Sequence, residues 1–180
     1  MLTHEQAIVI LKKYLKDEVN IKNSIAVGSI LRQLAKILRE NEELWAMTGL
    51  VHNVDYEYSI GELEKRGNLA KNLLDGLLPE EGVNAIQGLN YMHTEYIPTT
   101  SLDKALIAAE TASAFIKSIA KTITSQSVKD VDINMLMERF NDPEFAARFN
   151  RARIKVCVDI GFEVEEFLKV CLIVLQKLEN

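Results

Sequence analysis

The sequence contains only two cysteines and three prolines among its 180 residues. Cys157 and Cys171 lie on helical patterns and form no Cys-x-x-Cys pair, which excludes a cysteine metal site and favours two buried thiols over a disulfide. A reducing, cytoplasmic location is therefore expected. The prolines, Pro79, Pro98 and Pro143, each stand where a helix should begin or a loop should turn.

The sequence also has no excess of positive charge. The chain has 21 Lys and Arg against 26 Asp and Glu, a net charge of -5 and a pI near 5.3, and its basic residues are scattered among acidic ones. This excludes the electrostatic footprint of a nucleic-acid-binding protein and a basic membrane-binding face. The longest apolar run, 170–175, is far shorter than a membrane span. We therefore predict neither a nucleic-acid partner nor a membrane partner.

No stretch alternates apolar and polar residues for long enough to predict a sheet. Apolar residues instead recur at intervals of three and four, the spacing of helices with one buried face. Pro79 is expected in the first turn of one helix, Ser101 as the cap of another, and Asp142-Pro143 as the cap and first turn of a third. The fold class is predicted to be all-α, with helices over residues 2–15, 21–38, 44–52, 60–74, 80–92, 101 to about 123, and 162–178.

The most informative motif is the pair His52-Asn53. A histidine followed directly by an aspartate supplies an imidazole and a carboxylate from one short segment, and such a doublet can bind divalent cations. The pair resembles the His-Asp doublet of the HD-domain phosphohydrolases. The order of the surrounding segments is similar to that family over nearly the whole chain, in residues 21–27, 44–50, 55–57, 85–90, 98–106, 105–110 and 140–147.

The resemblance implies an HD-domain-like helical bundle, in one domain over residues 1–180. It implies a metal-site core at about 20–120 and a C-terminal helical extension at about 125–180. It also assigns the family's metal ligands to positions in this sequence. The early histidine falls at Asn23, the doublet at His52-Asn53, an optional histidine near Lys65, a further histidine at Leu89 and the late aspartate at Glu110.

Most of these positions no longer carry the family's ligand. Asn23 and Asn53 offer at best a neutral oxygen, and Leu89 offers nothing, whereas Mn, Fe or Mg prefers anionic oxygens and imidazoles. We therefore predict a degenerate site without a tight metal and no cofactor; if one is held, it should be a divalent metal (Mn, Fe, Mg, Ni or Zn). Glu110 is the only charged residue in 105–116, so we expect it to be buried and bonded to Asn23, Asn53 or His52.

A rearranged metal site is the alternative. His93 lies one helical turn after Leu89 and could ligate a metal together with His52 and Glu110, while Asp55 could supply a displaced carboxylate or act as a catalytic group with His52. The competing interpretations are that His93 caps its helix or faces solvent, and that Asp55 caps a neighbouring helix.

Three functions are consistent with these observations. The first is a catalytically impaired HD-domain-fold protein that binds a small molecule, for example a phosphorylated one, or a partner in a cleft formed by Asn23, His52, Asn53, Leu89, His93 and Glu110. The second is a metal-dependent phosphohydrolase acting on a nucleotide or another phosphate ester with the rearranged site. The third is a structural module that oligomerises, for example as a homodimer, through an exposed apolar stripe on 162–178. The sequence leaves open whether the chain is an enzyme.

Overall fold

The computed structural model describes residues 2–146 and 149–179, and within them every regular element is a helix. No strand occurs in this part of the chain, so the all-α prediction is confirmed. The α-helices are α1 (His4–Tyr14), α2 (Glu18–Leu38), α3 (Glu42–Val51), α4 (Asn68–Leu74), α5 (Glu80–Gly88), α6 (Ser101–Ala120), α7 (Ile133–Asn141), α8 (Pro143–Ala146), α9 (Arg151–Lys155) and α10 (Val164–Leu178). Short 3-10 helices are η1 (Tyr56–Tyr58), η2 (Leu63–Lys65), η3 (Val128–Asp130) and η4 (Val156–Ile160).

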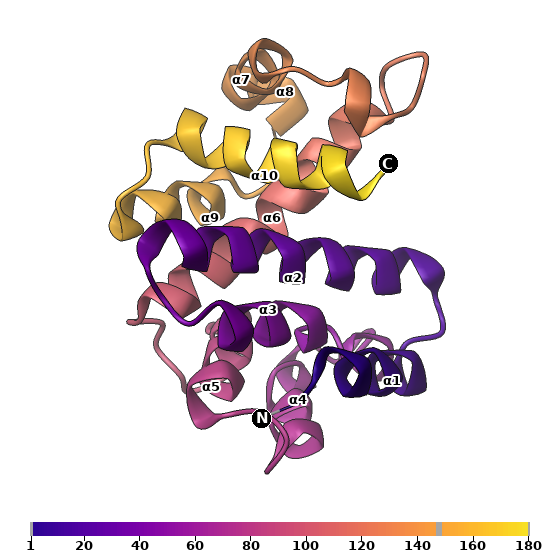
Figure 1. Ribbon diagram of the computed structural model, residues 1–180, viewed down its shortest axis with the longest axis vertical. Helices are drawn as coiled ribbons and strands as arrows, with labels where there is room; N and C mark the ends of the chain where they lie inside the picture. Colours follow the sequence, from indigo (N-terminus) through magenta and orange to yellow (C-terminus); the bar gives the residue numbers. More distant parts are fainter. Residues whose placement is uncertain (1, 147–148, 180) are drawn as a thin grey trace.

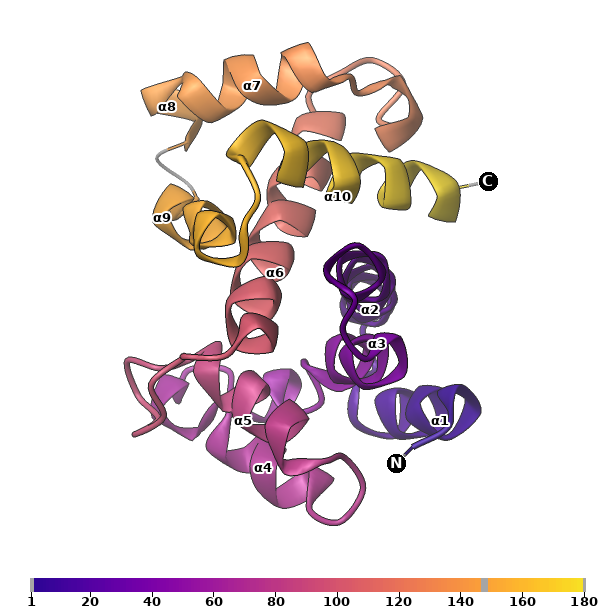
Figure 2. The same cartoon turned by 60° about the vertical axis from the view of Figure 1, so that its left-hand side comes forward.

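Helix α6 is the central element of the arrangement. It packs against α2, α5, α9 and α10, and in Figure 2 it runs as an upright column that joins the α4–α5 region to the C-terminal helices. Fourteen of its side chains are buried, including the fully enclosed ring of Phe115. Because α6 is covered from several sides, polar groups on it must find partners on the surrounding helices.

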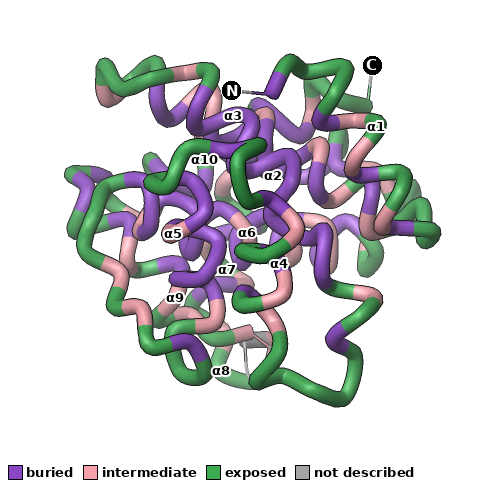
Figure 3. Tube along the Cα trace, turned by 90° about the horizontal axis from the view of Figure 1, so that it is seen from below, coloured by how far each residue is buried: buried purple, intermediate pink, exposed green. Residues whose placement is uncertain are grey.

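Helices α2 and α3 form an unusually close pair, and α10 crosses beside α2 on its other side (Figure 1). The close approach depends on Gly28 of α2 and Gly49 of α3, whose backbones lie directly against each other. Figure 3 shows the buried stretches of the chain gathered at the centre and the exposed stretches on the outside. This crossing carries the end of α3, and with it His52, into the interior.

Local capping signals account for several helix boundaries. Asp142 accepts hydrogen bonds from the backbone of Glu144 and Phe145, so the predicted cap before Pro143 is confirmed. The cap of α6 is Thr100 and not Ser101, because the Thr100 hydroxyl accepts the bond from the third residue of the helix. Pro79 occupies the cap position of α5 instead of its first turn.

The helix predicted over 60–74 is wrong in its first half, because α4 begins only at Asn68. Residues 60–67 instead contain turns and η2, and both Gly61 (φ 82°) and Gly67 (φ 88°) adopt left-handed backbone conformations. A right-handed helix cannot pass through such residues, and glycine adopts them without steric cost. Ile60, which the helical pattern treated as apolar core, is exposed.

The C-terminal helix uses its apolar side chains inside the molecule. Phe167, Leu168, Leu172 and Leu175 of α10 are buried, and the helix packs on α2, α6 and α7. The stripe was expected on Val170, Leu172, Ile173 and Leu175, and of these only Ile173 is exposed. Leu178 at the end of the helix is exposed as well, so α10 presents two separate apolar side chains rather than a continuous stripe, and homodimerisation through it stays a prediction.

Two further expectations concern the thiols and the membrane. Cys157 and Cys171 are both buried and unpaired, as predicted. Burial raises the pKa of the Cys157 thiol to about 11, which keeps it protonated and unreactive near neutral pH. Among residues 2–146 and 149–179, no helix is long and apolar enough to cross a membrane.

Candidate functional site

His52 lies at the carboxyl end of α3 and is only 1% exposed. Its Nδ1 is 2.6 Å from the carbonyl oxygen of Gly49; because a carbonyl can only accept, Nδ1 carries the proton. Nε2 is buried and has no hydrogen-bond partner among the described residues. Burial lowers the pKa of His52 to about 4, against the opposing effects of the Gly49 bond and the nearby Glu110 charge. At neutral pH the ring is therefore uncharged, and Nε2 presents a free lone pair.

Asn53 is buried beside His52 and is held by a basic side chain. The Asn53 Oδ1 accepts a hydrogen bond of 3.0 Å from Nη2 of Arg66, whose guanidinium also lies over the Tyr56 ring at 5.1 Å from its centroid. The optional histidine position was expected near Lys65, but Lys65 is exposed and pairs with Glu62. The residue that reaches the doublet is its neighbour, Arg66.

Asn23 on α2 faces α6. Its Oδ1 accepts hydrogen bonds from the Ser113 hydroxyl at 3.2 Å and from Nζ of Lys117 at 3.1 Å. Ser113 lies one helical turn after Glu110, so the two residues share one face of α6. Asn23 contacts that face from α2. Burial lowers the pKa of Lys117 to about 8, and the charge of Glu179 opposes that shift. The sequence pattern had not singled out either partner of Asn23.

Glu110 differs from expectation in both its burial and its partner. Its side chain is 26% exposed, and it pairs with Arg153 at 3.8 Å rather than with the polar residues of the doublet or of α2. Arg153 of α9 also donates from Nε to Thr111 and from Nη1 to the carbonyl oxygen of Leu89. The side chain of Leu89 is buried, as an apolar residue at that position should be. One arginine therefore joins two of the positions that the resemblance assigns to metal ligands.

Asp55 and His93 do not join His52 in a rearranged site. Asp55 is buried, and its Oδ2 accepts backbone hydrogen bonds from Gly67 at 2.6 Å and Ala70 at 3.1 Å, so it caps α4. Burial raises the pKa of Asp55, while these two bonds oppose the change. His93 is exposed in the turn that follows α5. Asp55 therefore caps a neighbouring helix and His93 faces solvent, which are the alternatives to a rearranged metal site.

The residues present do not fit a divalent metal centre. Nowhere in the described ranges do three or more His, Cys, Asp or Glu side chains gather closely enough to hold a metal ion. His52 alone has the arrangement typical of a metal-binding histidine, with one ring nitrogen bonded to a backbone carbonyl and the other free. One neutral ligand does not make a tight site, because hard divalent cations require several oxygen or imidazole donors.

Asn23, His52, Asn53 and Glu110, with the basic side chains that contact them, are called the His52 cluster below. Two cavities lie beside it. Lys117 lines one of about 590 Å³ between α2, α6, η3 and α10. Arg153 lines another of about 320 Å³ beside α6 and α9. The side chains that hold Asn23 and Glu110 therefore connect the buried cluster with the surface.

Comparison of the chain with protein-family models, curated proteins and solved structures found no match. The interpretation of the cluster therefore depends on its own geometry and chemistry.

Proposed function

We propose that this chain is an HD-domain-like protein in which basic side chains have replaced the metal centre, and that it binds a small phosphorylated ligand without hydrolysing it. One observation carries the proposal. Apart from His52 and the optional position near Lys65, every position assigned to a family ligand contacts a lysine or an arginine. Asn23 is bonded to Lys117, Asn53 to Arg66, and both Glu110 and the Leu89 carbonyl to Arg153.

The electrostatics of this arrangement favour an anion over a metal cation. A divalent ion beside His52 would meet the positive charges of Arg66 and Lys117, which lower the pKa of the His52 ring; the opposing charge there is Glu110, which is paired with Arg153. The same charges attract a phosphate group, for which the planar fork of arginine is well suited. His52 Nε2 can accept a hydrogen bond from a hydroxyl or amide group of the ligand.

The proposal assigns no hydrolytic step to this chain. Activation of water at neutral pH in such sites requires a metal ion that lowers the pKa of the bound water. His52 would be a weak general base, because its pKa of about 4 is far below neutrality. The buried Asp55, which could otherwise assist, is engaged in capping α4.

A metal-dependent phosphohydrolase remains the second candidate, and the free Nε2 of His52 is the observation that favours it. This alternative requires Glu110 to leave Arg153 and ligate a metal together with His52. It predicts metal-dependent hydrolysis of phosphate esters that is lost in a His52→Gln variant. The two candidates therefore differ in a measurable activity.

Restoring the family's ligands should create metal binding that the parent protein lacks. We expect Mn²⁺ or Ni²⁺ to raise the melting temperature of the combined variant Asn23→His, Asn53→Asp, Leu89→His, because a ligand that binds only the folded state stabilises it. The control carries Asn23→Gln, Asn53→Gln and Leu89→Met, which change the same positions without adding ligands of the family. Calorimetric melting with and without metal measures the difference. A parent protein that gains as much stability as the restored variant would contradict the proposal.

Phosphate binding should depend on the arginines of the cluster. In titration calorimetry with adenosine monophosphate and with inorganic phosphate, we expect Arg66→Gln and Arg153→Gln each to weaken binding about tenfold, the effect of losing one charge-assisted hydrogen bond. Lys169→Gln is the matched control, since Lys169 is exposed on α10 away from the cluster. If neither arginine variant changes the affinity, or if the parent binds neither anion, the binding function is wrong.

A further inference from the structure

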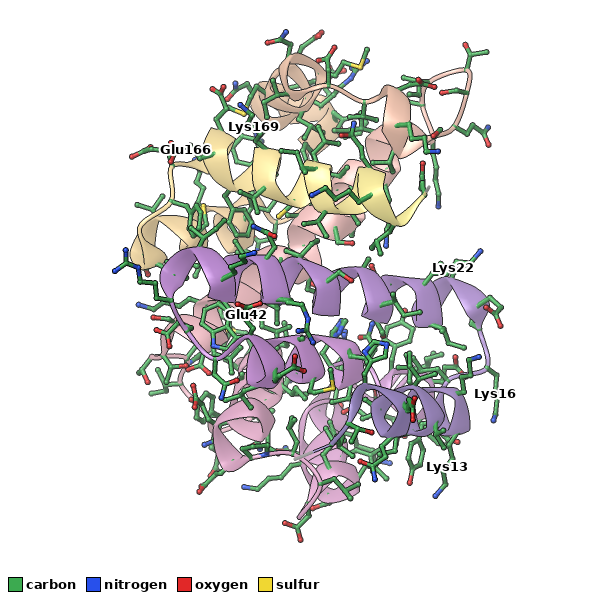
Figure 4. The ribbon with its side chains drawn as sticks, viewed as in Figure 1. Lys13, Lys16, Lys22, Glu42, Glu166 and Lys169 are labelled. Carbon is green, nitrogen blue, oxygen red and sulfur yellow. The ribbon has the colours of Figure 1, made fainter. Side chains whose placement is uncertain are left out.

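A second site is formed by the cavity of about 590 Å³, which we call the lysine cavity. It lies between the amino-terminal half of α2, the carboxyl end of α6, the segment 127–129 and the carboxyl end of α10. Three lysines line it: Lys22, Lys117 and Lys129. In Figure 4, Lys22 lies on the side of α2 that faces α10. The volume is in the range typical of small-molecule sites.

The wall of the lysine cavity is held in place by hydrogen bonds between distant segments. The Gln176 amide of α10 donates to the carbonyl oxygens of Val128 and Val131, at 3.3 and 3.0 Å. Glu179 accepts from the Ser127 hydroxyl at 2.8 Å and from the backbone of Val128 at 3.0 Å. These contacts tie η3 and its flanking residues to α10, so the cavity is largely preformed.

The charge of the cavity is opposite to that of the whole protein. Three lysines face one carboxylate, Glu179, which already bonds the segment 127–128, whereas the chain as a whole carries a net charge of -5. Lys117 is mostly protonated near neutral pH, since its lowered pKa is still about 8. These positive charges would attract an anion into the cavity.

The remainder of the lining is apolar. Ile25 and Ala26 of α2 face Leu175 and Leu178 of α10 across the cavity. Leu178 is 47% exposed and forms part of the rim of the cavity. A ligand that covers this rim would gain a binding free energy of about 25 cal/mol for each Å² of apolar surface it buries.

We infer that the lysine cavity binds a small amphiphilic anion, with a carboxylate or phosphate head at the lysines and a short apolar chain against Ile25, Leu175 and Leu178. This site goes beyond the proposed function, because it uses Lys22 and Lys129, which have no part in the His52 cluster. A free molecule fits better than a membrane surface, since the lysines face a hollow between helices in a protein that is acidic overall.

Titration calorimetry with four probes tests the inference. Octanoate and octyl phosphate carry both features, whereas octan-1-ol has only the chain and inorganic phosphate only the charge. We expect at least one of the amphiphilic anions to bind about tenfold or more tightly than either single-feature probe. Equal binding of octan-1-ol would reduce the site to a nonspecific apolar surface, and equal binding of inorganic phosphate would reduce it to a charge effect; either result overturns the inference.

Variants locate the binding. The double variant Lys22→Gln, Lys129→Gln should weaken binding of the amphiphilic anion about tenfold, and Leu178→Gln should weaken it by removing contact with the chain. All three residues are exposed, so the fold should tolerate these changes. Lys169→Gln, in the amino-terminal half of α10, is the matched control and should leave the affinity unchanged (Figure 4). Unchanged affinity in the double variant would overturn the inference.

Two further measurements separate the alternatives. The first is cosedimentation with phosphatidylcholine–phosphatidylserine vesicles. A higher affinity for the vesicles than for the free anions would show that the cavity binds a lipid surface and would overturn the inference of a small ligand. Loss of adenosine monophosphate binding in the Arg66→Gln variant, with octyl phosphate binding retained, would show that the two sites are separate. Failure of the proposed function therefore leaves the test of the lysine cavity intact.

Discussion

The variant Gly49→Ala is expected to lower the free energy of unfolding by about 3 kcal/mol, the upper part of the range for overpacking a close-packed interior. A methyl group on Gly49 would lie 2.7 Å from the Cα of Gly28 and 2.8 Å from its nitrogen. Both are backbone atoms, so the contact can be relieved only by moving α2 and α3 apart. That movement would also displace the Gly49 carbonyl that holds His52. Urea unfolding of parent and variant measures the difference.

The control for this prediction is Gly76→Asn. A side chain at Gly76 would meet no atom within 4 Å, and asparagine tolerates the left-handed conformation found there, with φ 67°. Stability should therefore change by less than about 1 kcal/mol. If Gly49→Ala is no more destabilising than the control, α2 and α3 do not cross as closely as described.

Burial of a neutral His52 is expected to make the protein less stable in acid. The pKa of His52 in the folded protein is about 4, below its ordinary value of 6.5, so between those values the unfolded chain binds a proton that the folded chain does not. The stability contribution is full above pH 6.5 and is lost as the pH falls toward 4. Between about pH 7 and about pH 4.5 the loss is about 2.5 kcal/mol of the free energy of unfolding.

Matched histidine variants isolate this effect from the titration of carboxylates. His52→Gln should remove that part of the pH dependence, because an amide does not titrate, although it can still donate to the Gly49 carbonyl. His93→Gln should retain the full dependence, since His93 is exposed. Unfolding by urea at both pH values provides the comparison. Parallel pH profiles for the parent and His52→Gln would show that His52 is not buried as a neutral base.

The basic side chains around His52 explain how the cluster remains satisfied without a metal ion. Buried polar groups are costly unless they are paired, and Asn23 and Asn53 each accept a hydrogen bond from a cation. Glu110 is balanced in charge by Arg153. Among the buried polar atoms described in this region, Nε2 of His52, one oxygen of Asp55 and the hydroxyl of Ser24, next to Asn23, remain without partners. In the proposed function, Nε2 is the acceptor that remains available to a ligand.

The sequence by itself determined those features that depend on neighbouring residues. Helical spacing of apolar residues, the cap at Asp142 and the burial of both cysteines could all be read locally, since each depends on backbone geometry or hydrophobicity within a few residues. The resemblance also singled out Asn23, His52 and Glu110, and the structure brings the side of α6 that bears Glu110 against Asn23. The segment 60–67 was misjudged because its apolar spacing outweighed the two glycines that interrupt it.

Only the tertiary structure decided which groups meet at the cluster. Arg153 contacts Glu110 and Leu89, which precede it in the chain by 43 and 64 positions. Lys117 likewise contacts Asn23, which precedes it by 94 positions. No local pattern marks such a partner, because an arginine that faces solvent and one that joins two helices look alike in the sequence. The difference arises from the packing of α9 and α2 against α6, which brings distant charges together and thereby sets the chemistry of the site.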